Sequence, residues 1–158
     1  MKNRIVLNVS CEDVFNYITT EFINDYEKRK KTVLDRKTIV PGLTFSKAIG
    51  REKKTKNISM ATAKLLKYKY PYEYSFEYLS KTYYRVTEIK LTPLSESKCE
   101  LLTMNYQEKL KNGEKPHSYD FDSEEIEGMS FFQKYQYKSM ERQIKKGRKN
   151  ALIEKKKK

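Results

Sequence analysis

At 158 residues the chain has the length of one domain, and a domain of this size buries about two-thirds of its unfolded surface. Hydrophobic residues make up 37%, charged residues 35% and aromatic residues 13%, and so large an aromatic share excludes a disordered polyelectrolyte. The formal net charge is +13, while no run approaches the ~18 apolar residues that a membrane span requires. We therefore expect a globular domain with a heavily charged surface.

The residue types that usually carry chemistry are sparse. Cys11 and Cys99 lie far apart with no CxxC spacing, which argues against a zinc or thioredoxin-type site and favours free thiols in a reducing cytoplasm. The only histidine, His117, falls in a loop with Gly113 and Pro116, so a histidine-dependent triad or a multi-histidine metal site is excluded. Glycine-rich phosphate loops are absent too. We expect a cytoplasmic protein with no metal and no cofactor; no catalytic residue is predicted, because the 21 acidic residues leave a carboxylate acid–base pair open but single none out.

The chain begins with a predicted strand and helix. In residues 4–9, Ile5, Leu7 and Val9 alternate with polar or smaller side chains, which is typical of a strand. Ser10, with Asp13 three positions on, predicts a helix cap and therefore a helix from Cys11. The helix should end in the basic run 28–31, where positive charge complements the helix dipole. Its apolar positions recur at helical spacing and form one stripe: Val14, Phe15, Ile18, Phe22 and Tyr26.

Pro41-Gly42 interrupts the chain, and the pattern then changes to strands. Short connections between consecutive strands predict an antiparallel meander. The predicted strands are 43–49, 58–70, 72–80, 83–91 and 99–110.

A second long helix is predicted from Asp122 or Ser123, each of which could cap it. One of its faces should cover the sheet: Met129, Phe132, Gln136, Met140, Ile144, Gly147 and Ala151. We expect one domain over residues 1–151, followed by a basic, disordered tail over 152–158.

This order of elements resembles the START-like (SRPBCC, helix-grip) superfamily. Three segments carry the resemblance: VSCEDVF (9–15), YPYEYSF (70–76) and LTPLSESKCELLT (91–103). Within the superfamily the chain is most similar to a small uncharacterised family from low-GC Gram-positive bacteria. The resemblance implies an α+β fold in which a curved antiparallel sheet of six or seven strands wraps around a long C-terminal helix, with one or two short helices after the first strand.

A row of aromatic residues occupies every even position from Tyr68 to Tyr78. Pro71 cannot donate a ladder hydrogen bond, so it predicts a hairpin that splits the row. A three-residue loop would keep both halves on one face, whereas a two-residue loop would not. Three interpretations stay open: strand packing beneath the C-terminal helix, the wall of a small-molecule pocket, or a stacking platform for single-stranded nucleic acid.

The pocket interpretation brings a set of candidate ligand-binding residues. Arg85 is the most informative member, because it shares strand parity with Ile89, and an inward guanidinium could hold an anionic group. The full set is Tyr74, Phe76, Tyr78, Arg85, Ile89, Met104, Tyr106, Phe132 and Tyr135.

The positive charge is concentrated at the C-terminus. Residues 142–158 contain nine basic residues against one acidic residue, Glu154. Such a segment is most often a solvated helix end, but it could also contact an anionic membrane surface or nucleic acid. The basic segment comprises Arg142, Lys145, Lys146, Arg148 and Lys149, with the lysines that follow.

The leading hypothesis is a domain that binds a hydrophobic or amphipathic small molecule between the sheet and the C-terminal helix, without catalysis. The alternative is a protein-interaction or nucleic-acid-binding module that uses the basic segment, with a weak acidic partner such as nucleic acid or an anionic membrane.

Overall fold

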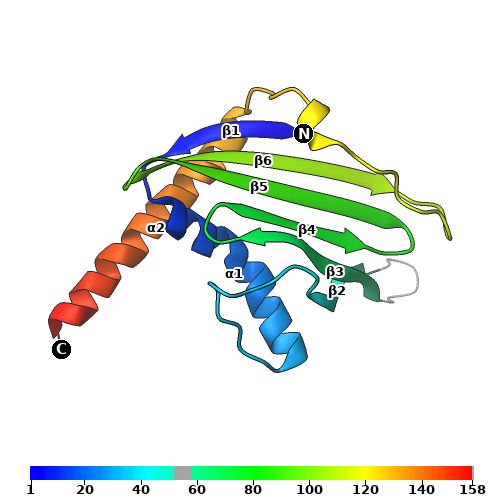
Figure 1. Ribbon diagram of the computed structural model, residues 1–158, viewed down its shortest axis with the longest axis horizontal. Helices are drawn as coiled ribbons and strands as arrows, with labels where there is room; N and C mark the ends of the chain where they lie inside the picture. Colours follow the sequence, from blue (N-terminus) through cyan, green and yellow to red (C-terminus); the bar gives the residue numbers. More distant parts are fainter. Residues whose placement is uncertain (52–57, 158) are drawn as a thin grey trace.

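The computed structural model describes residues 1–51 and 58–157, and the side chains of 1–50 and 58–148. Six antiparallel strands form one curved sheet in the order β1-β6-β5-β4-β3-β2, with the helices against one face (Figure 1). We call this the inner face and the opposite one the outer face. The predicted α+β class, with one curved antiparallel sheet of six strands and a long C-terminal helix, is confirmed. The strands are β1 (Lys2–Leu7), β2 (Thr44–Arg51), β3 (Ile58–Lys69), β4 (Glu73–Leu79), β5 (Tyr83–Ser95) and β6 (Lys98–Lys109).

Helix α1 (Cys11–Lys30) begins where the sequence predicted. The Ser10 side chain accepts a hydrogen bond from the Asp13 backbone N–H at 3.2 Å, which satisfies one of the donors left free at a helix start. At the other end Lys31 adopts a left-handed conformation with φ 52°. Its neighbour Thr32 donates a backbone hydrogen bond to the Glu27 carbonyl at 3.2 Å, which closes the last turn.

The hairpin at Pro71 resolves the question of the aromatic row. β3 and β4 pair Lys69 with Glu73 and Tyr68 with Tyr74, so the loop has three residues, 70–72. With a three-residue loop, the even-numbered residues on either side of it point to the same face of the sheet. Tyr68 therefore shares the inner face with Tyr74. The two halves of the row form one surface.

That surface packs against α1. Phe15 meets Tyr68 edge to face, with ring centroids 5.2 Å apart. Phe22 meets Tyr74 in the same way at 6.1 Å and lies 6.0 Å from Phe76. Tyr74 is only 2% exposed. The packing interpretation is thus right for Tyr74 and Phe76, but the covering helix is α1 and not the C-terminal one, and Tyr68 is buried in the same cluster.

The second helix, α2 (Phe131–Lys157), begins later than predicted, because its cap is Ser130 and not Asp122 or Ser123. The expected start at 122 or 123 holds only a short 3₁₀ turn, Phe121–Ser123, after which the Glu127 backbone N–H bonds to the Lys2 carbonyl along β1. The helix is capped by a reciprocal pair instead: Ser130 Oγ accepts from the Gln133 N–H at 3.2 Å, and Gln133 Oε1 accepts from the Ser130 N–H at 2.9 Å.

Helix α2 packs against β1 and α1, and its C-terminal half projects beyond the sheet (Figure 1). Met140 and Ile144 are buried on its inner side. Phe132 is 67% exposed, so the predicted cover of the sheet by this face is wrong for the first turns of the helix. The helical backbone continues to Lys157, past the boundary expected at residue 151.

Because Phe22 joins α1 to three aromatic rings of the sheet, those of Phe45, Tyr74 and Phe76, we expect Phe22→Ala to lower the free energy of unfolding by about 3–5 kcal/mol. Urea denaturation followed by circular dichroism measures this change. Val33→Ala is the control. Because Val33 is 89% exposed, this substitution should change the free energy of unfolding by no more than about 0.5 kcal/mol. Equal effects of the two substitutions would contradict the packing described above.

Candidate functional site

An open groove lies on the inner face beside α1, with a volume of about 530 Å³. Ligand pockets in proteins usually measure about 300–1,000 Å³. Four elements build the groove, so its lining comes from separate parts of the sequence. The lining residues are Glu21 of α1, residues 47–49 of β2, Phe76 and Tyr78 of β4, and Tyr83 and Arg85 of β5.

Arg85 is the polar group that distinguishes the groove. It pairs across the strands with Tyr78, so the two side chains share the inner face. Its Nε atom is buried and has no hydrogen-bond partner among the residues that the structure describes. A buried donor of a charged group without a partner is costly, because its hydration is lost without replacement. The arrangement suits an acceptor supplied from outside the chain.

The other cation of the groove, Lys47, is already paired with two carboxylates of the chain. Its Nζ lies 3.0 Å from Glu21 Oε1 and 2.8 Å from Asp25 Oδ2. Burial alone would lower the pKa of Lys47, but the hydrogen bonds to Asp25 and Glu21 outweigh it and raise the pKa. Burial also raises the pKa of the Tyr78 hydroxyl, against the opposing effect of Lys47. This hydroxyl therefore stays protonated at neutral pH and can donate.

The structure brings together only part of the predicted ligand-binding set. Phe76, Tyr78 and Arg85 line the groove. Tyr74 and Ile89 belong to the buried core, where the space around Tyr74 beneath α1 does not admit a water-sized sphere.

Met104 and Tyr106 lie on the wrong face to join the groove. They pair with Glu88 and Val86, whose side chains have the parity opposite to that of Arg85. Together with Phe121 they form a small apolar cluster on the outer face. Because side chains alternate between the two faces along β6, Met104 and Tyr106 cannot reach the inner face, whatever their size or polarity.

Two predicted members on α2 do not reach the groove either. Phe132 and Tyr135 are 67% and 57% exposed, at the start of the helix. The groove instead uses Tyr83, Lys47 and Glu21, which the sequence analysis missed. Tyr83 could have been predicted from the sequence, because it lies two residues from Arg85 on the same strand and so faces the same side. No sequence signal indicates that Lys47 of β2 and Glu21 of α1 lie beside Arg85.

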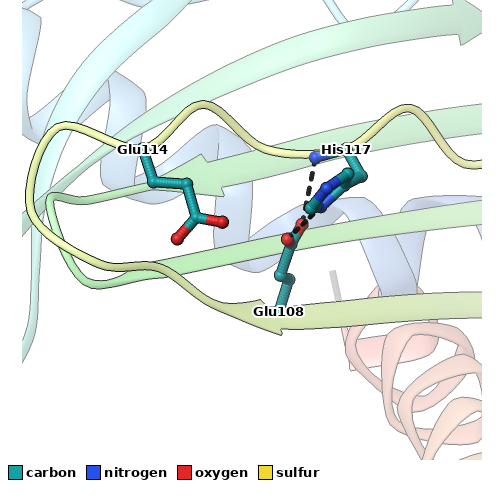
Figure 2. A group of neighbouring side chains, drawn as sticks. All are labelled: Glu108, Glu114 and His117. Atoms are coloured by element: carbon teal, nitrogen blue, oxygen red, sulfur yellow. Dashed lines mark hydrogen bonds and ion pairs between the residues drawn. The ribbon is translucent and has the colours of Figure 1, made fainter.

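A second polar cluster lies at the end of β6, where Glu108 faces two residues of the following loop, Glu114 and His117 (Figure 2). The ligand atoms of the three side chains lie within 4.8 Å of one another. One imidazole and two carboxylates could in principle take a divalent cation. His117 is, however, already paired with Glu108 through its Nδ1 and its backbone N–H, and Glu114 accepts from the Lys111 N–H. We describe the cluster as an ion pair that fastens the loop to β6.

The basic segment is partly neutralised by neighbours within the chain. Lys145 Nζ lies 3.6 Å from Glu141, and Arg148 Nε lies 2.5 Å from Asp13 Oδ2. Arg142 stands over the ring of Tyr135, 5.6 Å from its centroid. Lys146 is exposed. The side chain of Lys149 lies outside the described residues.

His117 provides a direct test of the loop contact. Its hydrogen bond and charge interaction with Glu108 raise its pKa above the ordinary 6.5. The raised pKa means that the contact stabilises the fold below the pKa of the unfolded chain, and that this contribution is lost as the pH rises through the folded pKa. Because the chain has a single histidine, one NMR titration reports it without ambiguity.

We expect Glu108→Gln to return the pKa of His117 towards 6.5, because both the acceptor charge and the strongest hydrogen bond are weakened. Glu114→Gln is the control, with a smaller decrease expected, because Glu114 acts on His117 only through its charge. A His117 titration that Glu108→Gln leaves unchanged would show that the loop contact does not form in solution.

A family model described as a domain of unknown function (DUF3284) matches residues 1–121. No curated protein matches the chain. Among the residues that the structure describes, no helix is long and apolar enough to span a membrane.

Several solved structures are similar in fold. A conserved protein from Geobacillus kaustophilus is 15% identical, with a TM-score of 0.45, over 70% of this chain and 74% of its own. Truncated norcoclaurine synthase from Thalictrum flavum is 8% identical, with a TM-score of 0.44, over the same shares. An HSP90 activator from Plasmodium falciparum is 12% identical, with a TM-score of 0.39, again over 70% and 74%. The match over residues 1–121, which spans all six strands and α1, shows that the chain belongs to the DUF3284 family.

Proposed function

We propose that the protein binds an amphipathic small molecule with an anionic group in the groove beside α1. The observation that carries the proposal is the buried Arg85 Nε, which has no acceptor among the described residues. A guanidinium can donate two parallel hydrogen bonds to a carboxylate, sulfonate or phosphate, and such charge-assisted bonds are stronger than neutral ones.

The surroundings of Arg85 supply the apolar part of such a site. Phe76 and Tyr78 form one wall, with ring centroids 5.1 Å apart, and Tyr83 and Ile49 line the same groove. Aromatic rings bury much surface, and the tyrosine hydroxyls can orient a polar group of the ligand. This pairing of an aromatic wall with one cation fits an amphipathic anion better than a neutral hydrocarbon.

The proposed site differs in position from the one expected from the sequence. The groove is bounded by α1, β2, β4 and β5, whereas the sequence placed the ligand against the C-terminal helix. In this proposal the protein acts as a binding domain, and its location is cytoplasmic.

Two dyes that differ by one charged group test the proposal. 8-Anilinonaphthalene-1-sulfonate carries a sulfonate, and N-phenyl-1-naphthylamine has the same rings without it. We expect Arg85→Gln to weaken binding of the sulfonate at least about tenfold, since a hydrogen bond to a charged group contributes roughly 1.5–3 kcal/mol. Binding of the neutral amine should stay the same. Fluorescence titration measures both.

The matched control is Lys64→Gln, which removes the same charge from an exposed position of β3 on the outer face. It should leave both affinities unchanged. If Lys64→Gln and Arg85→Gln weaken the sulfonate equally, the dye responds only to net charge and the proposed site is wrong. If only Arg85→Gln weakens the sulfonate, native mass spectrometry of the freshly purified protein should next release a natural ligand that is an amphipathic anion.

A second candidate function rests on the shape of α2. Its C-terminal half projects beyond the sheet and exposes Lys146, so we keep a weak acidic partner, either nucleic acid or an anionic membrane, as the alternative. Such binding should fall steeply with salt, because phosphate contacts release counterions. The internal pairing of Lys145 and Arg148 leaves fewer charges for this role.

A further inference from the structure

The two cysteines meet in the folded protein. Cys11 Sγ lies 3.0 Å from Cys99 Sγ. Cys11 is 6% exposed and Cys99 is fully buried. Both are free thiols, and they come from different elements, the first residue of α1 and the second residue of β6.

The topology explains why residues so distant in sequence come together. β1 pairs with β6 so that Leu7 is opposite Cys99. After Leu7 the chain turns through Ser10 into α1 and passes back over the inner face, which places Cys11 above its partner. The positions of the two cysteines are therefore set by the register of β1 with β6 and by the cap of α1. Neither cysteine lies in a surface loop.

We propose that Cys11 and Cys99 form a modification site, at which a peroxide converts the two thiols into an intramolecular disulfide. An S–S bond measures about 2.05 Å, so the sulfur atoms need to approach by roughly 1 Å to bond. The disulfide would join α1 covalently to β6.

The oxidation proceeds in two balanced steps. The Cys11 thiolate attacks one peroxide oxygen, the O–O bond breaks, and Cys11 becomes a sulfenic acid while hydroxide leaves and takes up the thiol proton as water. The Cys99 sulfur then attacks the Cys11 sulfur, and the sulfenic oxygen departs as a second water with the Cys99 proton. Two thiols are oxidised and one hydrogen peroxide is reduced to two waters.

Cys11 is assigned the first step because it has the only exposure in the pair and lies at a helix N-terminus, where backbone N–H groups favour a thiolate. Burial nevertheless raises the pKa of the Cys11 thiol, although its hydrogen bond with Cys99 opposes the rise. Burial also raises the pKa of Cys99. The reaction should therefore be slower than that of an exposed low-pKa cysteine.

The test treats the reduced full-length protein with hydrogen peroxide and measures its intact mass without reductant. We expect a mass lower by two hydrogen atoms, restored by dithiothreitol, and a proteolytic peptide pair that links Cys11 to Cys99. Oxidised wild type should also unfold at a higher temperature than reduced wild type, because the closed loop restricts the unfolded chain. Cys11→Ser and Cys99→Ser should each lose the mass decrease and the temperature difference.

Failure has clear signatures in the wild-type protein alone. A mass increase by oxygen atoms without the loss of hydrogen would show that the two sulfurs do not meet, and the proposal would be overturned. Disulfide-linked dimers in place of the intramolecular bond would overturn it as well. Neither result depends on whether the serine variants fold.

Discussion

The contact on which the structure depends is the packing of the aromatic row of β3 and β4 against one face of α1. Phe15 and Phe22 each meet several rings of the sheet edge to face, an arrangement worth about 0.5–1.5 kcal/mol per pair beyond the area buried. This contact holds α1 on the inner face of the sheet. The groove lies beside this contact, since Glu21 of α1 and Phe76 of β4 both line it.

Strand alternation then places each candidate residue of the sheet on either the inner or the outer face. Arg85 and Tyr78 face inward as a cross-strand pair, while Val86 and Tyr106 face outward beneath the segment that contains Phe121. An aromatic-rich strand can therefore supply a groove and an unrelated outer cluster at once. Composition alone cannot separate these roles, because tyrosine stabilises strands on both faces.

The sequence was sufficient for the elements that depend on local signals. The cap at Ser10 and the hairpin at Pro71 follow from local chemistry, and both were predicted. The start of α2 was missed because Asp122 resembles a cap, whereas the reciprocal pair of Ser130 and Gln133 forms the actual one. The groove could not be predicted, because it requires Lys47 and Glu21 to meet β5 through tertiary packing. The alternation of residues along one strand shows which side chains share a face, but it does not show which other elements pack against that face.

Under the proposed function, the comparison of Lys47 with Arg85 explains why net charge is a poor guide to anion binding. Both are cations in one groove of a domain whose formal net charge is +13. Lys47 is held by two carboxylates of α1, so a ligand would have to compete with the chain itself for its ammonium group. Arg85 meets no such competition at Nε within the described part of the chain. Selectivity for an anion would therefore come from the absence of an internal partner at one position, and the excess of positive charge elsewhere would contribute only long-range attraction.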